Sequence, residues 1–260
     1  MAPNTSMASI RPEEFGYRHA RHLLNRAGFG GTAEQIATLQ QMGLDAAVDH
    51  LVDFQNIDPG DLMAVNVDSD IIRPWSDEEQ RALRQARRTN DRATLERYRA
   101  MQLMRLGEDR EQMGSIEQWW LGRMISTPRP LEEKLTLLWH GHFASNHRTV
   151  RDSYLMLRQN MLFRRNANGN LADLVVGIVR DPAMIKFLNN DSNRKSHPNE
   201  NLARELMELF TLGEGNYTEG DIREGARALT GYTVDDDEFV FRRGMHDSGH
   251  KTILGQRVNF

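Results

Sequence analysis

Apolar side chains recur at helical spacing along most of this chain, in segments that Gly and Pro residues separate. A period of 3.6 residues places such positions on one face of an α-helix. Only GYTVDDDEFVFRR, from Gly231, alternates with the two-residue period of strands around an acidic turn, and KTILG adds a third short strand. We therefore predict a mainly α fold, a multi-helix orthogonal bundle with a small antiparallel β element at residues 231–260.

The helices expected from this pattern end at recognisable caps and stops. A helical hairpin with Thr32 as a cap is followed by a third helix, and then by a loop over Gln55–Trp75 that contains Pro and Gly. Further helices are expected at 116–126, 130–139, 150–165, 171–179, from Pro182 and across HPNENLARELMELFTLG. We interpret residues 1–260 as the N-terminal portion of one larger α-helical domain.

Residues 78–111 form the most charged segment, which we predict to be two exposed helices broken near Thr89. Eight Arg residues lie between Arg81 and Arg105, a stripe that could bind phosphates. No aromatic or Gly pattern accompanies them, so a solvated face with Glu–Arg pairs explains them as well. The net charge of −4 and the lack of a phosphate-cradling or dinucleotide motif argue against nucleic-acid binding.

Composition excludes two further classes of protein. No stretch approaches the roughly 18 apolar residues of a membrane span, and a chain without Cys has neither disulfides nor thiolate metal ligands. The first residues, MAPNTSMASIRPEEF, lack a basic leader and an apolar core, which favours the cytoplasm. Any metal would have to be bound by His, Asp and Glu.

The sequence WHGHFASNH supplies the first candidate site. His140 and His142 would point about 200° apart on a helix, but they would face the same way in an extended backbone, which Gly141 permits. His-x-His in that form is a common metal-ligand spacing. The alternative is a helix C-terminus at which the imidazoles stack on Trp139 and Phe143.

The helix HPNENLARELMELFTLG supplies the second candidate. Its polar face carries Glu200, Arg204 and Glu208 at i, i+4 and i+8, with Pro198 in the first turn. A solvated charge ladder explains the spacing, but a buried ladder could tune one carboxylate as a base or metal ligand. Asn201 would then orient a substrate. The preceding loop adds the possible ligands Asp191, Asn193 and His197.

A third candidate is HDSGHK, in which His246 and His250 could meet only through a turn because Gly249 intervenes. A polar loop explains this motif equally well. Were His140, His142, His246 and His250 brought together by folding, they would suit a divalent metal such as zinc, iron or manganese.

Several long segments together resemble one bacterial family. They are HLLNRAGFGG, RMISTPRPLEEKLTLLWHGHFASN, RDPAMIKFLNNDSNRKSHPNENLARELMELFTLGEGNYTEGDIREGARALTGYTV and FRRGMHDSGHKTILGQ. The chain looks like a member of the family called domain of unknown function 1800. This resemblance implies that the present chain lacks the C-terminal part of a longer protein. It also implies a protein that is often exported, and a partner in the form of a second, secreted protein encoded beside it. It implies no activity.

Two functions fit these patterns. One is a hydrolase-like enzyme, with or without the assistance of a metal, in which His197, Glu200, Asn201, Arg204 and Glu208 form the polar site and Arg204 stabilises negative charge. The other is a non-catalytic scaffold or accessory protein that binds a secreted partner or an extracellular polymer, where the same residues form structural hydrogen bonds.

Overall fold

The computed structural model describes residues 9–60 and 64–259, and these are mostly helical. Helices account for 63% of the structure, with 12 α-helices and two small antiparallel sheets near the C-terminus in the described part. The predicted fold class is therefore confirmed. None of the helices in the described ranges is both long and apolar enough to span a bilayer.

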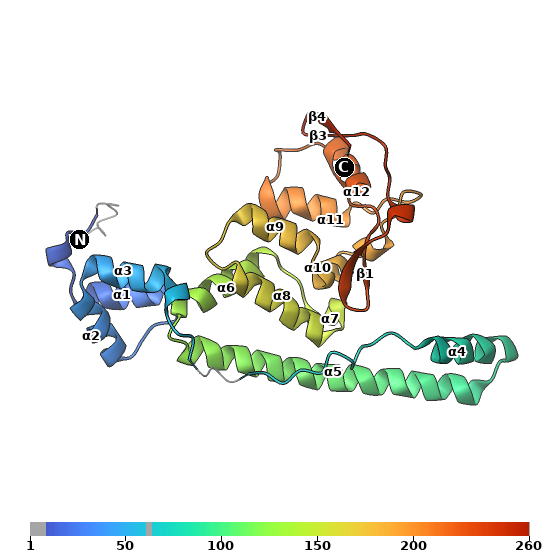
Figure 1. Cartoon of the computed structure of the whole chain (residues 1–260), viewed down its shortest axis with the longest axis horizontal. Coiled ribbons are helices and arrows are strands. Elements are labelled where there is room, and N and C mark those ends of the chain that lie inside the picture. The colour runs from blue at the N-terminus through green and yellow to red at the C-terminus, as the bar shows by residue number, and fades with distance from the viewer. Residues whose placement is uncertain (1–8, 61–63, 260) are drawn as a thin grey trace. The chain divides into compact units, whose positions relative to one another are not determined.

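The contacts between Cα atoms divide the chain into two compact units (Figure 1). The first unit comprises residues 1–64 and 119–138, and the second comprises 65–118 and 139–260. Two helices, α5 (Arg92–Ser126) and α6 (Pro130–His142), contribute residues to both units.

The first unit is built on three short helices, α1 (Tyr17–Ala27), α2 (Ala33–Met42) and α3 (Leu44–Val52). Thr32 accepts a hydrogen bond from Gln35 N and Gln35 returns one to Thr32 N, which is the capping box expected of this sequence. Single turns of 3-10 helix lie at Pro12–Glu14 and Phe54–Asn56. The apolar faces meet in a core of Ala20, Leu24, Ile36, Leu39, Ala47 and Leu51.

In the second unit α4 (Asp77–Thr89) turns into α5 through Asn90, which adopts the left-handed conformation. The predicted break near Thr89 is confirmed. The separate helix predicted at 116–126 is wrong, because α5 continues through Gly107 and Gly114. A Gly inside a helix costs only about 1 kcal/mol relative to Ala, and no Pro is present to break the hydrogen-bond ladder.

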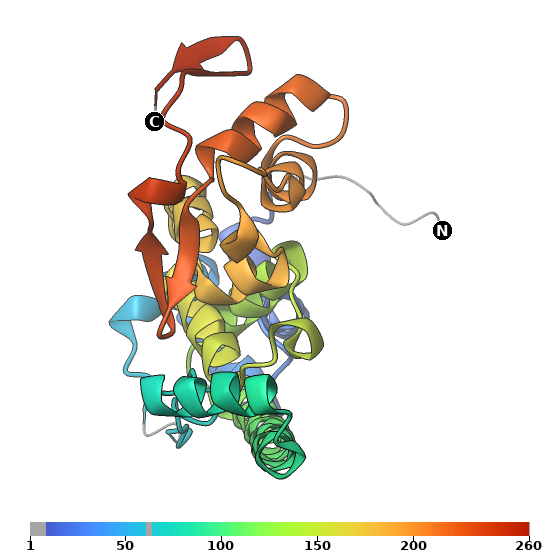
Figure 2. The ribbon, with the colours of Figure 1, turned by 90° about the vertical axis from the view of Figure 1, so that its right-hand side faces the viewer.

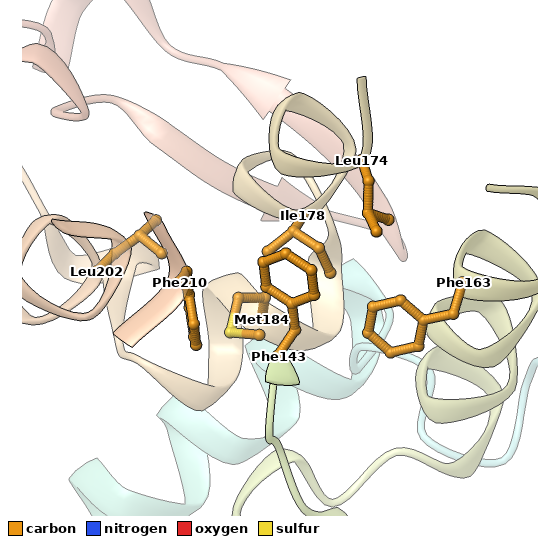
Figure 3. Close-up of a cluster of buried hydrophobic side chains, with 7 residues drawn as sticks. All are labelled: Phe143, Phe163, Leu174, Ile178, Met184, Leu202 and Phe210. Atoms are coloured by element: carbon orange, nitrogen blue, oxygen red, sulfur yellow. The ribbon is translucent and has the colours of Figure 1, made fainter. Parts of the chain in front are cut away.

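The core of the second unit forms around Phe143, which lies between Phe163 and Phe210 at ring-centroid distances of 6.0 and 5.1 Å (Figure 3). Leu174, Ile178, Met184 and Leu202 complete the cluster. The helices α8 (Ser153–Arg165), α9 (Leu171–Val179), α10 (Pro182–Phe187) and α11 (Asn201–Glu205) supply side chains to this cluster, and Phe210 comes from the segment after α11. The short helix α7 (His147–Val150) contributes Val150 to a separate buried cluster.

The helix predicted across residues 197–213 differs from the structure in two ways. It begins only at Asn201, so Pro198 and Glu200 precede it, and after Glu205 it continues as a π-helix over Leu206–Thr211. Leu209 lies within this π-helix, and its side chain is 60% exposed. The side chain of Thr211 donates to the carbonyl of Leu206, five residues back, at 2.6 Å.

The C-terminal segment folds as a helix and two hairpins (Figure 2). Helix α12 (Glu219–Ala228) precedes β1 (Tyr232–Asp235) and β2 (Glu238–Phe241), which pair antiparallel around the acidic turn as predicted. The predicted third strand, β3 (Lys251–Ile253), does not join them. It pairs with β4 (Gln256–Val258), a strand that sequence reasoning missed, and packs against α12.

Candidate functional site

The loop before α11 is organised by asparagine side chains. Asn193 is buried, and its amide donates to Oδ1 of Asn190 at 3.0 Å and to the carbonyl of Ala226 at 3.0 Å. Its Oδ1 accepts from the backbone N–H of Asn199 at 2.9 Å. Asn193, a candidate ligand by sequence, is thus occupied in joining this loop to the end of α12.

The other candidates in this loop face solvent. His197 and Asp191 are exposed, and the backbone N–H of His197 closes a turn onto Arg194 at 2.8 Å. Asn201 is also exposed, and its side-chain contact with the carbonyl of Leu188 measures 3.5 Å. The structure does not bring these three side chains together with the charge ladder of the following helix.

Arg204 lies between two acidic side chains, Glu200 and Glu219. We call these three residues the Arg204 cluster. The guanidinium donates to both carboxylate oxygens of Glu219, at 2.8 and 2.9 Å, and to Oε2 of Glu200 at 3.1 Å. Glu219 begins α12, so this pair joins α11 to the next helix. The hydrogen bonds from Arg204 lower the pKa of Glu219, which keeps that carboxylate ionised.

Glu208, the third member of the predicted ladder, takes a different partner. It lies in the π-helix and accepts a hydrogen bond of 2.9 Å from the hydroxyl of Tyr217. Burial first, and then this hydrogen bond, raise the pKa of Tyr217 above its usual range. The structure therefore groups Glu200 with Arg204, as predicted, but pairs Glu208 with an aromatic residue that the sequence did not single out.

His140 and His142 are both helical and belong to the last turn of α6. Nε2 of His140 is 3.1 Å from the amide nitrogen of Asn160, and its ring meets the face of Phe163 edge-on at 4.6 Å. Nε2 of His142 is 2.9 Å from the carbonyl oxygen of Phe210. Burial, and secondarily Arg164, lower the pKa of His140 to about 4, which makes it neutral at pH 7.

His246 and His250 lie in the loop that precedes β3. Nδ1 of His246 is 2.9 Å from the carbonyl oxygen of Thr230, whereas His250 is exposed and its backbone carbonyl accepts from Arg227. Across residues 9–60 and 64–259, no three His, Asp or Glu side chains are grouped as they would be to hold a metal ion.

A second set of charges, the Arg227 cluster, consists of Glu224, Arg227, Asp247 and Lys251. Arg227 donates to Asp247 at 2.7 and 3.2 Å and to both oxygens of Glu224 at 2.8 Å. These bonds lower the pKa of Asp247 to about 2. Lys251 is fully buried and donates to the backbone carbonyl of Asp247. The cluster fixes the loop before β3 on α12.

Sequence reasoning also passed over a buried acid–imidazole pair. Oδ2 of Asp109 in α5 lies 2.6 Å from Nε2 of His147 at the start of α7, and Oδ1 accepts from the backbone N–H of Ser153 at 2.6 Å. Asp109 is 1% exposed. The sequence offered no local signal for it, because the two residues are 38 positions apart and Asp109 is one of several acids in α5.

Comparison with known proteins adds one match. Residues 22–259 match the model of the family described as Protein of unknown function (DUF1800), which is nearly the whole chain. No curated protein and no solved structure matches.

Proposed function

The chain belongs to the family described as Protein of unknown function (DUF1800), and because that description assigns no activity, we propose a function from the geometry of the polar clusters. The proposal is a non-catalytic scaffold or accessory protein that binds another protein. One observation carries it: the carboxylates of the Arg204 and Arg227 clusters are each engaged by a guanidinium that joins two elements of the fold.

These pairings favour a structural role over catalysis. A general base works best with a pKa near the working pH and with an open side toward the substrate. The Arg partners instead lower the pKa of Glu219, Glu224 and Asp247. His140, whose pKa of about 4 keeps it neutral, packs against Phe163 in the core.

The stability of an Arg204→Met variant tests this proposal. Catalytic residues are commonly kept at a cost in stability, so replacing them leaves a protein as stable or more stable. A structural Arg behaves in the opposite way, and we expect the urea midpoint of Arg204→Met to fall. Arg165→Met, which removes an exposed Arg with no ion pair among the described residues, is the matched control and should leave the midpoint unchanged.

A surface for a protein partner is present in the first unit. A groove of about 580 Å³ is lined mainly by apolar side chains, among them Phe29, Leu121 and Ile125. Ile125 is 83% exposed and Leu121 is 57% exposed. Adjoining exposed apolar side chains of this kind mark protein interaction sites. The proposed occupant is an apolar segment of the second, secreted protein that the family resemblance implies as a neighbour.

Binding to that neighbouring protein can be measured directly. Ile125→Glu places a charge in the groove and should abolish binding, whereas Leu103→Glu, at a position 63% exposed on the part of α5 in the second unit, should leave it intact. Equal loss in both variants, or no binding by the wild-type protein, would count against this partner.

A hydrolase-like enzyme is the second candidate, and the π-helix favours it. Such segments occur frequently at functional sites, and this one carries Glu208 with its hydroxyl partner Tyr217. Turnover of ester, phosphoester or glycoside substrates by the wild-type protein, lost in Glu208→Gln with helix content unchanged, would support it. Elemental analysis beside a His140→Ala/His142→Ala variant tests whether zinc, iron or manganese takes part.

A further inference from the structure

The outward face of α1 carries a concentration of positive charge. Arg18, Arg21 and Arg26 are exposed there, and His22 lies among them, while Ala20 and Leu24 turn inward to the core of the first unit. At 1.5 Å per residue the three Arg residues span about 12 Å of helix. The helix thus presents a short cationic strip of three guanidinium groups.

No acid in the described part of the chain neutralises this strip. Among residues 9–60 and 64–259, none of the three guanidinium groups forms an ion pair or a side-chain hydrogen bond. Glu14, which lines the same hollow as the strip, is bonded by Arg11, and that hydrogen bond lowers the pKa of Glu14. The three guanidinium groups are therefore available to an external anion.

The strip borders a hollow. Arg18, Arg21, His22 and Arg26 line an open cavity of about 1140 Å³, together with Phe15 and Leu44. A concave surface lets several donors reach one ligand, which a convex helix face does not.

His19 adds a donor of defined character at the same place. The backbone N–H of Gly16 donates to Nδ1 of His19 at 3.2 Å, and the ring stacks on Phe15 at a centroid distance of 6.4 Å. Because Nδ1 accepts this bond, the proton of the neutral imidazole resides on Nε2. His19 also lines the cavity. It therefore offers a ring N–H beside the guanidinium groups.

We propose that this cavity binds a compact ligand that carries two or more phosphate groups. Guanidinium forks match phosphate oxygens in bidentate geometry, and three unpaired forks around one hollow suit a multiply charged oxyanion. A strip of about 12 Å reaches too few phosphates for tight binding to duplex nucleic acid, whose affinity grows with the number of contacts. This inference does not depend on the proposed scaffold role, and each can be refuted without the other.

Calorimetric titration with tripolyphosphate, at low and at physiological salt, tests this inference. We expect binding that weakens as salt rises, and a loss of affinity of about tenfold or more in Arg18→Gln/Arg21→Gln. Arg81→Gln/Arg88→Gln removes the same charge from exposed positions of α4 and should leave the affinity within about twofold of wild type.

Three results would overturn the proposal. The first is no binding of tripolyphosphate by the wild-type protein at low salt. The second is an equal loss in both double variants, since this would show attraction to overall charge without a site. The third is binding of mixed-sequence duplex DNA more tightly than tripolyphosphate. Circular dichroism and thermal melting of both variants establish that each is folded before it is titrated.

Discussion

The guanidinium of Arg227 donates to both carboxylate oxygens of Asp247, at 2.7 and 3.2 Å. The two residues are 20 positions apart, on α12 and in the loop before β3. A bidentate pair fixes the relative orientation of the two groups as well as their distance. The β3–β4 hairpin is thereby anchored to α12 through a side-chain pair as well as through packing.

Replacing Asp247 by Asn should lower the free energy of unfolding by about 1 to 2 kcal/mol. This is the contribution of a charge-assisted hydrogen bond, reduced because the pair is partly exposed to solvent. Asn cannot reproduce two acceptors, so one guanidinium N–H of Arg227 loses its partner. Urea denaturation measures the change. The exposed neighbour Ser248→Ala is the control, and an equal loss in both variants would show that the pair contributes nothing specific.

Asp109 should be among the residues least tolerant of truncation. Asp109→Ala removes the acceptor for His147 and for the N–H of Ser153 in a place that is 1% exposed, so we expect a loss of about 2 to 4 kcal/mol. Glu108→Ala alters an exposed acid one position earlier and should change stability by less than about 0.5 kcal/mol. A small effect at Asp109 would contradict the structural role.

The buried cap Asp181 should make stability depend on pH. Burial raises its pKa to about 6, so the folded state holds a proton more tightly than the unfolded chain does. The stabilisation of the folded state by the protonated Asp181 is complete below about pH 4 and is lost as the pH rises through 6. Asp181→Asn keeps an acceptor for Met184 N and Gln159. The free energy of unfolding of this variant should therefore match that of the wild-type protein near pH 4 and exceed it by about 2 to 3 kcal/mol at pH 7.

His140 acts in the opposite direction over nearly the same range. The pKa of His140, about 4, lies below the pKa of His in the unfolded chain. The stabilisation by the neutral imidazole is therefore present above about pH 6.5 and is lost as the pH falls through 4. Once Asp181→Asn removes the opposing effect, the variant should lose stability more steeply than wild type between pH 6.5 and 4. Chemical denaturation at several pH values checks this, and parallel pH profiles for the two proteins would contradict it.

Gly231 has a positive φ of 82°, and a Cβ there would lie 2.7 Å from the carbonyl oxygen of Arg242. Its N–H donates to Asn193 O at 3.0 Å. Gly231→Ala should cost about 1 to 3 kcal/mol. Gly244→Ala, where a Cβ meets nothing within 4 Å, should have little effect on the melting temperature. The strain argument fails if the two variants melt alike.

Local signals made much of the fold predictable. Thr32, Pro182 and the acidic turn after β1 are helix-start and turn residues whose effect is confined to a few neighbours, and each lies where it was expected. The π-helix after Glu205 and the continuity of α5 through Gly114 were missed. Tertiary packing decides both, and a helical period alone does not report it.

The candidate site was less predictable because its partners are distant in sequence. The i, i+4 spacing placed Glu200 beside Arg204, but the second acid, Glu219, comes from the next helix. His140 and His142 shared a metal-ligand spacing only in extended backbone, and the structure keeps both in α6. Periodicity therefore located polar faces, whereas the contacts between those faces required the fold.

A double-mutant cycle on Arg204 and Glu219 tests the central claim that these polar residues hold the fold together. The free energies of unfolding of Arg204→Met, Glu219→Gln and the double variant would be compared with that of the wild-type protein. The structural account predicts that each single variant is less stable and that the double variant loses less than the sum. Single variants as stable as wild type or more stable, with no coupling, would contradict it and favour a catalytic site.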